Sequence, residues 1–272
     1  MTWIRCLCEV NSLENKVNNI GNKARRLQKF LKLHPVCCFC LGTAKATTRD
    51  HLPPQSAFIN NISPKGYIFP ACEKCNNGSS EFDSVFAMIS RFDPFSEQNT
   101  LIENESTKLI RAFLENHSDS LPKDLTTKEK RGWMKKANLE KAAGELYRDF
   151  PLVRVTPEIN ESIKKVSAKL IKALHYKHTA KIVPSEDSLK IRWWSNAQLM
   201  TGQFPSEMLD TVNLRPILKS GKSILNEQFT YGYQISEDGS LGMYVALFRK
   251  TFAVIGLVAF NPELLKTQEN SQ

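Results

Sequence analysis

Two pairs of cysteines, each with two residues between its members, constrain the fold of this chain more than any other feature. Cys37 and Cys40 lie in the segment VCCFCLG, and Cys72 and Cys75 lie in PACEKCN, about thirty residues later. A tight turn within each pair can direct both thiolates to one ion, and four sulfurs complete the tetrahedral coordination of zinc. Such a closed site is structural, and a segment of about sixty residues with little core of its own needs this kind of cross-link. The pattern therefore predicts a zinc-stabilised module in this part of the chain.

The other cysteines add less. Cys38 could replace Cys37 as a ligand only by breaking the two-residue spacing, so we treat it as a bystander. The total of seven cysteines is odd, and the two C-x-x-C pairs favour metal binding in a reducing compartment over disulfide bonds. By themselves the cysteines favour a zinc ribbon without catalytic activity.

Composition narrows the class of protein. The chain has 272 residues with 41% hydrophobic content, which is enough to fill a core. Its net charge of +9 and pI near 9.2 favour a polyanionic partner, although they say nothing of the fold. Residues 1–8 are too short and too mixed for a secretory signal, and the most apolar segment, around residues 253–260, is only strand-sized. We therefore expect a cytoplasmic protein that does not enter a membrane.

The residue pattern divides the chain into three parts: a basic N-terminal helix (1–34), the cysteine-containing module (35–95) and a C-terminal region of unknown role (96–272). Helical spacing of apolar residues predicts helices over 12–33, 101–116, 127–149 and 158–176. Aromatic and β-branched residues predict strands over 189–194, 229–235, 241–249 and 251–260, with a hairpin turn at 237–239. The expected class is α+β, with a small zinc module followed by helices and an antiparallel sheet.

A second motif lies between and after the cysteine pairs. Asp50 and His51 stand together in TTRDHLPPQSAF, and Asn76 directly follows the last cysteine in CNNGSSEFD. This arrangement resembles the HNH endonuclease family, in the variant C-x-x-C, then Asp/Glu-His-x-x-Pro, then C-x-x-C-Asn followed by a small residue and an acidic one. The resemblance covers about sixty of the 272 residues and needs all three elements to coincide in order.

The resemblance implies a ββα-metal unit with a treble-clef zinc site, in which a hairpin presents Asp50 and His51 and a short helix beginning near Asn76 packs across it. It implies that His51 is the general base that activates water, while Asp50 and Asn76 hold one divalent metal ion. These residue types suit phosphodiester hydrolysis apart from the resemblance, because a neutral histidine can activate water and one hard cation can neutralise the phosphodiester. Oxygen ligands from Asp and Asn suit Mg²⁺ or Mn²⁺.

The chain departs from the family pattern at one position. The middle Asn, expected about five residues before Cys72, falls at Tyr67, so another group or a backbone carbonyl would have to orient His51. Asn76, Ser80 and Asp83 stand at i, i+4 and i+7, one face of a helix, so Asp83 could reach the metal or a water beside it. A solvated or helix-terminal charge explains Asp83 equally well.

These observations predict a metal-dependent endonuclease that hydrolyses phosphodiester bonds in DNA. RNA stays open as a substrate, because the site reads phosphate rather than sugar. The resemblance implies a role in bacterial defence or a mobile element, and residues 96–272 would serve target recognition or contact with a protein partner. The alternative is a zinc-stabilised nucleic-acid-binding module with a decayed nuclease centre. The retained Asp50-His51 pair favours the enzyme, and the missing middle Asn favours the alternative.

The basic N-terminal helix generates the first prediction. Its cations are Lys23, Arg25, Arg26, Lys29 and Lys32, and each phosphate that they neutralise releases counterions. Changing Arg25 and Arg26 to alanine should weaken DNA binding and reduce the slope of log affinity against log salt by roughly one for each phosphate that the helix no longer neutralises. Fluorescence anisotropy across a salt series measures both quantities. If affinity and slope stay unchanged, this helix presents only a solvated face.

Overall fold

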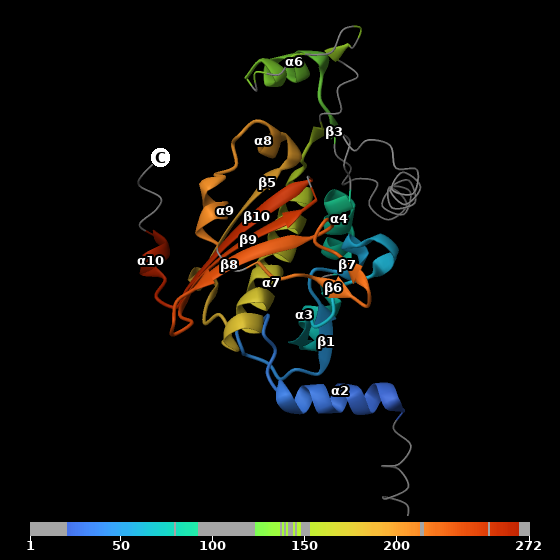
Figure 1. The fold of residues 1–272 in the computed structure, drawn as a ribbon, viewed down its shortest axis with the longest axis vertical. Coiled ribbons are helices and arrows are strands. Elements are labelled where there is room, and N and C mark those ends of the chain that lie inside the picture. Colours follow the sequence, from blue (N-terminus) through green and yellow to red (C-terminus); the bar gives the residue numbers. More distant parts are fainter. Residues whose placement is uncertain are drawn as a thin grey trace, which may run out of the picture.

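The computed structural model contains a four-stranded antiparallel sheet in the C-terminal half of the chain (Figure 1). Its strands lie in the order β5 (Leu189–Ser195), β10 (Phe252–Ala259), β9 (Leu241–Phe248) and β8 (Thr230–Ile235). They confirm the four strands predicted from the residue pattern, and Gly239 adopts a φ of 66° in the expected turn between β8 and β9. The structure describes residues 21–78, 80–91, 123–136, 138, 140, 144, 146, 147, 153–212, 215–249 and 251–266.

Helix α7 (Pro157–Thr179) packs against one face of this sheet. Thr156 caps its N-terminus by accepting a hydrogen bond from the backbone N–H of Ile159 at 3.3 Å, next to a proline that needs no such partner. A Cβ atom at Gly256 of β10 would lie 2.4 Å from Cγ1 of the buried Ile171. The missing side chain therefore lets α7 approach the middle of the sheet closely.

The opposite face of the sheet has its own small core. The residues that face it are Trp194, Val245 and Ile255, whose side chains alternate with those that face α7. The short helices α8 (Asn196–Met200) and α9 (Glu207–Thr211) cover this face through Leu199, Met208 and Leu209. The sheet is thus covered by helices on both faces.

The cysteine-containing module begins with the loop that carries Cys37 and Cys40, closed by a bridge between Val36 and Lys45, and continues with a two-stranded sheet. β1 (Thr48–His51) pairs antiparallel with β2 (Ile68–Ala71), and the helices η1 (Gln55–Ala57) and η2 (Ile59–Asn61) lie between them in the chain. α3 (Glu73–Asn77) follows β2, then α4 (Ser80–Arg91). The prediction of a helix beginning near Asn76 was wrong by three residues. The extended backbone of Cys72 forms the N-cap, so the first turn of α3 contains Cys75.

The module shares a hydrophobic core with the sheet. The ring of Phe86 on α4 lies 5.0 Å from that of Phe248 and 5.1 Å from that of Phe252, both on the sheet. The hydroxyl of Tyr67 in the module shares a hydrogen bond of 2.8 Å with that of Tyr231 on β8. One cluster of buried residues therefore runs from the cysteines through α7 to β8 and β10. The module is packed onto the rest of the chain rather than held by a linker alone.

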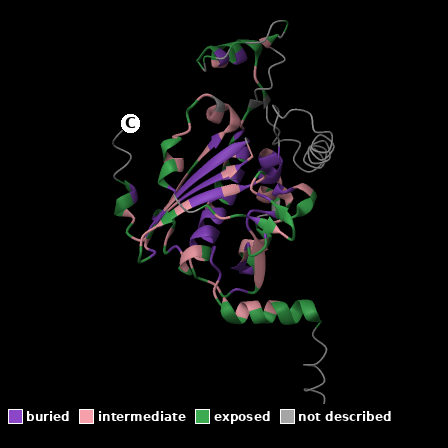
Figure 2. Ribbon diagram, viewed as in Figure 1, coloured by how far each residue is buried: buried purple, intermediate pink, exposed green. Residues whose placement is uncertain are grey.

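The remaining elements are short or peripheral. α2 (Asn22–Leu33) has no buried residue and is mostly green in Figure 2. β3 (Lys123–Asp124) pairs with β4 (Val153–Arg154), β6 (Lys219–Ser220) pairs with β7 (Ser223–Ile224), and α6 (Thr127–Lys136), η5 (Glu186–Ser188) and α10 (Glu263–Lys266) complete the set. The helix expected over 101–116 and the first part of that over 12–33 lie outside the described residues, and of the one over 127–149 the structure describes α6. The chain is a mixed helix-and-sheet protein.

In the described parts of the chain, every helix is too short or too polar to cross a lipid bilayer.

The contact between α7 and the sheet generates a stability prediction. Gly256→Ala should lower the free energy of unfolding by about 1–3 kcal/mol, because the added methyl group overlaps the buried Ile171. Urea unfolding followed by circular dichroism measures this change.

Gly132→Ala is the matched control, because a Cβ atom there meets nothing within 4 Å on α6. Alanine at this helical position should leave the free energy of unfolding unchanged or raise it by up to about 1 kcal/mol. Equal stability of the Gly256→Ala variant and the parent would mean that α7 can shift away from the sheet at no cost in free energy.

Candidate functional site

The four cysteines predicted from the sequence come together. Their sulfur atoms, from Cys37, Cys40, Cys72 and Cys75, lie within 4.8 Å of one another. Zinc bound tetrahedrally at about 2.3 Å places its sulfur ligands about 3.8 Å apart, so small adjustments would close the site. This cluster could hold a metal ion, and its ligand set of four sulfurs is compatible with structural zinc.

The local backbone explains how the first pair forms. The N–H of Cys37 donates to the carbonyl of Ala44 at 3.0 Å, and the N–H of Phe39 donates to the sulfur of Cys37 at 3.4 Å. Leu41 and Gly42 have positive φ values of 57° and 75°, which turn the chain back on itself. Both thiols of the pair therefore face the same side of this loop.

Cys38 stays out of the cluster. Its side chain is buried, and its thiol donates to the carbonyl of Pro70 on β2 at 3.4 Å. Burial raises the pKa of this thiol far above its usual range. Its place agrees with the sequence interpretation that it is a bystander.

The clustered thiols influence one another. Burial raises the pKa of Cys37, and burial together with the neighbouring Cys72 thiol raises the pKa of Cys75. At Cys40 burial also acts to raise the pKa, but hydrogen bonds with Thr43 and Cys37 outweigh it and lower the pKa to about 7. Four adjacent thiolates repel each other, so full deprotonation of the cluster depends on a bound cation.

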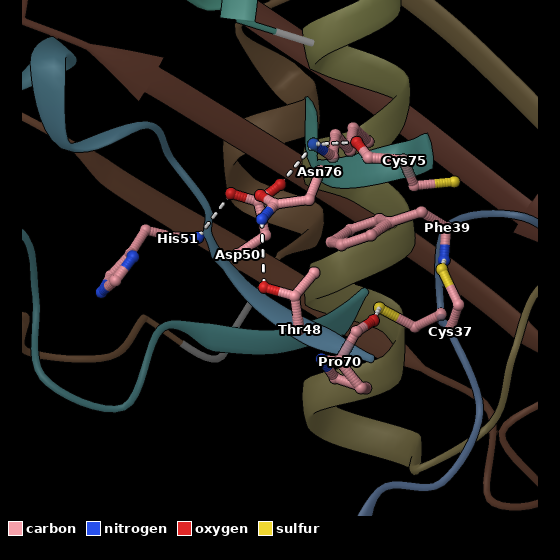
Figure 3. Close-up of polar contacts among 10 residues, drawn as sticks. Cys37, Phe39, Thr48, Asp50, His51, Pro70, Cys75 and Asn76 are labelled. Atoms are coloured by element: carbon pink, nitrogen blue, oxygen red, sulfur yellow. Dashed lines mark hydrogen bonds and ion pairs between the residues drawn. The ribbon is translucent and has the colours of Figure 1, made fainter. Parts of the chain in front are cut away.

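Asp50 and His51 are neighbours on β1, opposite Phe69 and Ile68 of β2. Side chains alternate along a strand, and Figure 3 shows the imidazole of His51 pointing away from the Asp50 carboxylate. Asn76 on α3 donates from its amide nitrogen to the hydroxyl of Thr48 at 3.2 Å. The Asp50 and Asn76 side chains consequently gather on one side of β1, as Figure 3 shows.

His51 is half-buried. Burial lowers the pKa of its imidazole, an effect that the nearby Asp50 carboxylate partly opposes. Within the described part of the chain, its ring forms no hydrogen bond. Tyr67, at the position of the missing Asn, has a buried ring, and its hydroxyl bonds to Tyr231 instead. The residue at this position therefore stabilises the core and does not orient His51.

Asp83 lies apart from this group along the chain. α3 ends at Asn77 with Gly78 as its C-cap, and Asp83 belongs to the separate helix α4, which packs mainly on α7 and η1. The expectation of one continuous helical face through Asn76 and Asp83 was therefore wrong. The role of Asp83 as a metal ligand stays a prediction, and a helical face shared with Asn76 no longer supports it.

Lys169 is the residue that the sequence interpretation missed. This residue of α7 forms an ion pair with Oδ2 of Asp50 and donates to the carbonyl of Cys75 at 2.9 Å. Its ammonium also lies 5.0 Å from the centre of the Phe39 ring. The sequence did contain one indication of this role. Lys169 follows Val166 by three residues, so it lies on the apolar face of α7, where the helical period predicts a hydrophobic side chain.

No family model, curated protein or solved structure matches this chain. The family resemblance therefore rests on the motif residues alone.

The expected divalent metal does not fit beside Asp50 as the residues are arranged. One carboxylate oxygen is paired with the Lys169 ammonium, and the other accepts the backbone N–H of His51 at 2.8 Å. Two positive charges about 4 Å apart repel by about 4 kcal/mol at an effective dielectric constant of 20, and a divalent ion doubles this figure. Asp50 and Asn76 have suitable oxygen atoms, but the lysine would have to leave before Mg²⁺ or Mn²⁺ could bind.

The cysteine cluster generates a prediction about zinc. Reduced protein should contain about one zinc ion per chain, and Cys72→Ser should lose it, because a closed site needs all four sulfurs. Without the metal, the module should become sensitive to proteases over residues 36–78. Elemental analysis and limited proteolysis measure these changes.

Cys38→Ser is the matched control, since Cys38 is buried in the same loop outside the cluster, and it should retain the zinc. Folded, reduced parent protein that contains no zinc would contradict the prediction.

Proposed function

We propose that this chain is an HNH-type endonuclease that hydrolyses phosphodiester bonds in DNA. The observation that carries the proposal is the arrangement of β1, β2 and α3. This arrangement gathers Asp50 and Asn76 on one side of β1, beside the four-cysteine cluster, and the adjacent residue His51 directs its imidazole away from them. A treble-clef module with structural zinc and a ββα centre would have this order of elements. A purely structural zinc module has no need of the Asp50-His51 pair.

In the proposed reaction His51 acts as the general base. Its neutral imidazole takes a proton from water, and the water oxygen forms a bond to phosphorus. The bond from phosphorus to the leaving sugar oxygen breaks, and that oxygen takes a proton from solvent. The phosphate and not the sugar is attacked in this step, so RNA is also an acceptable substrate.

The surface near this centre supports a nucleic-acid partner. α2 packs near β1, and all five of its basic side chains are exposed. Figure 1 shows α2 projecting from the body of the molecule below β1. With the net charge of +9, such a helix can follow a phosphate backbone toward the candidate centre. Residues 96–272 would then contribute target recognition or bind a protein partner.

A zinc-stabilised binding module with a decayed centre is the second candidate. Two observations favour it: Lys169 pairs with Asp50, and the described residues provide no hydrogen bond to the His51 ring. Both candidates bind nucleic acid, so affinity does not separate them, and only cleavage by the intact site does.

His51→Ala decides between these functions. It should abolish cleavage of plasmid DNA, because general-base catalysis contributes a factor of about 10² to 10⁴. Zinc content and the unfolding midpoint should change little, since His51 lies outside the cysteine cluster and is only half-buried. Gel electrophoresis of plasmid over time measures the rate.

His34→Ala is the control, because His34 bonds to Tyr176 away from the Asp50-His51 pair, and it should cleave like the parent. Cleavage at the parental rate by purified His51→Ala would leave the second candidate as the function of the module.

A further inference from the structure

The ion pair between Lys169 and Asp50 joins the C-terminal region to the candidate centre. Both side chains are largely buried, with 10% and 14% of their surfaces exposed. Isolated charges are costly to bury, so each of these groups requires the other. The ammonium is therefore a fixed part of the site in this structure.

The ammonium of Lys169 contacts both elements that carry the candidate metal ligands. Its second partner, the carbonyl of Cys75, belongs to the residue immediately before Asn76. The lysine thus bridges the strand that carries Asp50 and the helix that carries Asn76. The expected divalent ion would have linked these same two elements.

A basic cavity lies next to this position. It has a volume of about 160 Å³ between α3, the start of α4 and α7, and Lys74, Lys165 and Lys169 line it. None of the described residues that line it is acidic, but two of its lysines have carboxylate partners outside the lining: Lys165 lies 3.4 Å from Glu161, and Lys169 pairs with Asp50. A phosphate group would meet lysine side chains at this face of the module.

We propose that Lys169 supplies the positive charge at Asp50 in place of a divalent metal ion, and that lysine side chains neutralise the phosphodiester. The ion pair places this charge at Asp50 whether or not the chain is a nuclease. Its consequence for cleavage rests on the proposed nuclease function. Mg²⁺ or Mn²⁺ would then be dispensable, whereas structural zinc would not.

The first test is Mn²⁺ binding to zinc-loaded protein, measured by electron paramagnetic resonance of the free ion. Parent protein should show no Mn²⁺ site that depends on Asp50. Lys169→Gln should bind Mn²⁺ at least about tenfold more tightly than the parent, because removal of the ammonium leaves the Asp50 carboxylate without its counter-charge. The double variant Lys169→Gln/Asp50→Asn should lose this gain.

Lys172→Gln is the matched control. Lys172 lies one turn along α7, and its side chain is 7% exposed where that of Lys169 is 10% exposed. It donates to the carbonyl of Phe39 at 3.3 Å and to Glu186 at 2.6 Å. Its replacement disturbs the same interface without touching Asp50 and should leave Mn²⁺ binding as in the parent.

Stoichiometric Mn²⁺ binding by the parent that Asp50→Asn removes would overturn the proposal, and this result does not depend on whether Lys169→Gln folds. An equal Mn²⁺ affinity of folded Lys169→Gln and the parent would overturn it as well.

The second test is plasmid cleavage in EDTA and in Mg²⁺, with zinc content measured after each incubation. Equal rates in the two buffers, with zinc retained, support the proposal. Cleavage that stops in EDTA while zinc is retained overturns it. A chain that cleaves nothing in either buffer contradicts the proposed nuclease function, and the Mn²⁺ titration still decides the role of Lys169.

Discussion

The arrangement of this protein depends on the packing of α7 between the cysteine-containing module and the sheet. One side of the helix approaches β10 at Gly256, where no side chain keeps it away. Another side carries Lys169, Lys172 and Lys177, whose ammonium groups donate to module carbonyls at Cys75, Phe39 and Gly66. Lys169 and Lys172 are buried and Lys177 is exposed, so the two buried cations depend on these oxygen partners, and any other packing of α7 on the module would leave them without partners. The candidate centre therefore takes its final form at an interface between distant parts of the chain.

The cysteine cluster and the shared core stabilise the module in different ways. The cluster joins the loop at residues 37–40 to the first turn of α3, which aligns α3 against β1 and brings Asn76 to Thr48. The core beneath contains large apolar side chains such as Phe58, Phe69 and Phe86, which also contact the sheet. A metal ion bound by the cluster would stabilise the part of the module that buries little surface of its own, while hydrophobic packing stabilises the part where α7 and the sheet supply the missing surface.

Tyr67 and Lys169 are the two residues at which the structure departs from the arrangement that the motif resemblance implies. Tyr67 stands where the motif has an asparagine, and it places an aromatic ring in the core and its hydroxyl against Tyr231 and, through it, His178. Burial lowers the pKa of His178 to about 4, so this group of hydrogen bonds is neutral and serves the core. At Asp50, a cation from α7 takes the place where a free ion was expected. The module is therefore integrated into the protein more fully than its short motif suggests.

Local patterns in the sequence determined the main strands, the longest helix and the four cysteines that cluster. The four strands, α7 and the cysteine cluster follow from period, residue type and spacing, because these properties act over a few neighbouring residues. The position of Asp50 beside His51 on a strand also follows from the motif. The start of α3 was missed by three residues, because Cys72 continues the extended backbone of β2 and serves as the N-cap. Only the tertiary structure decided that Lys169 lies against Asp50 and that Tyr67 is buried. These two facts depend on α7 and β8, which are far from the motif in sequence and come close only when the whole core has packed.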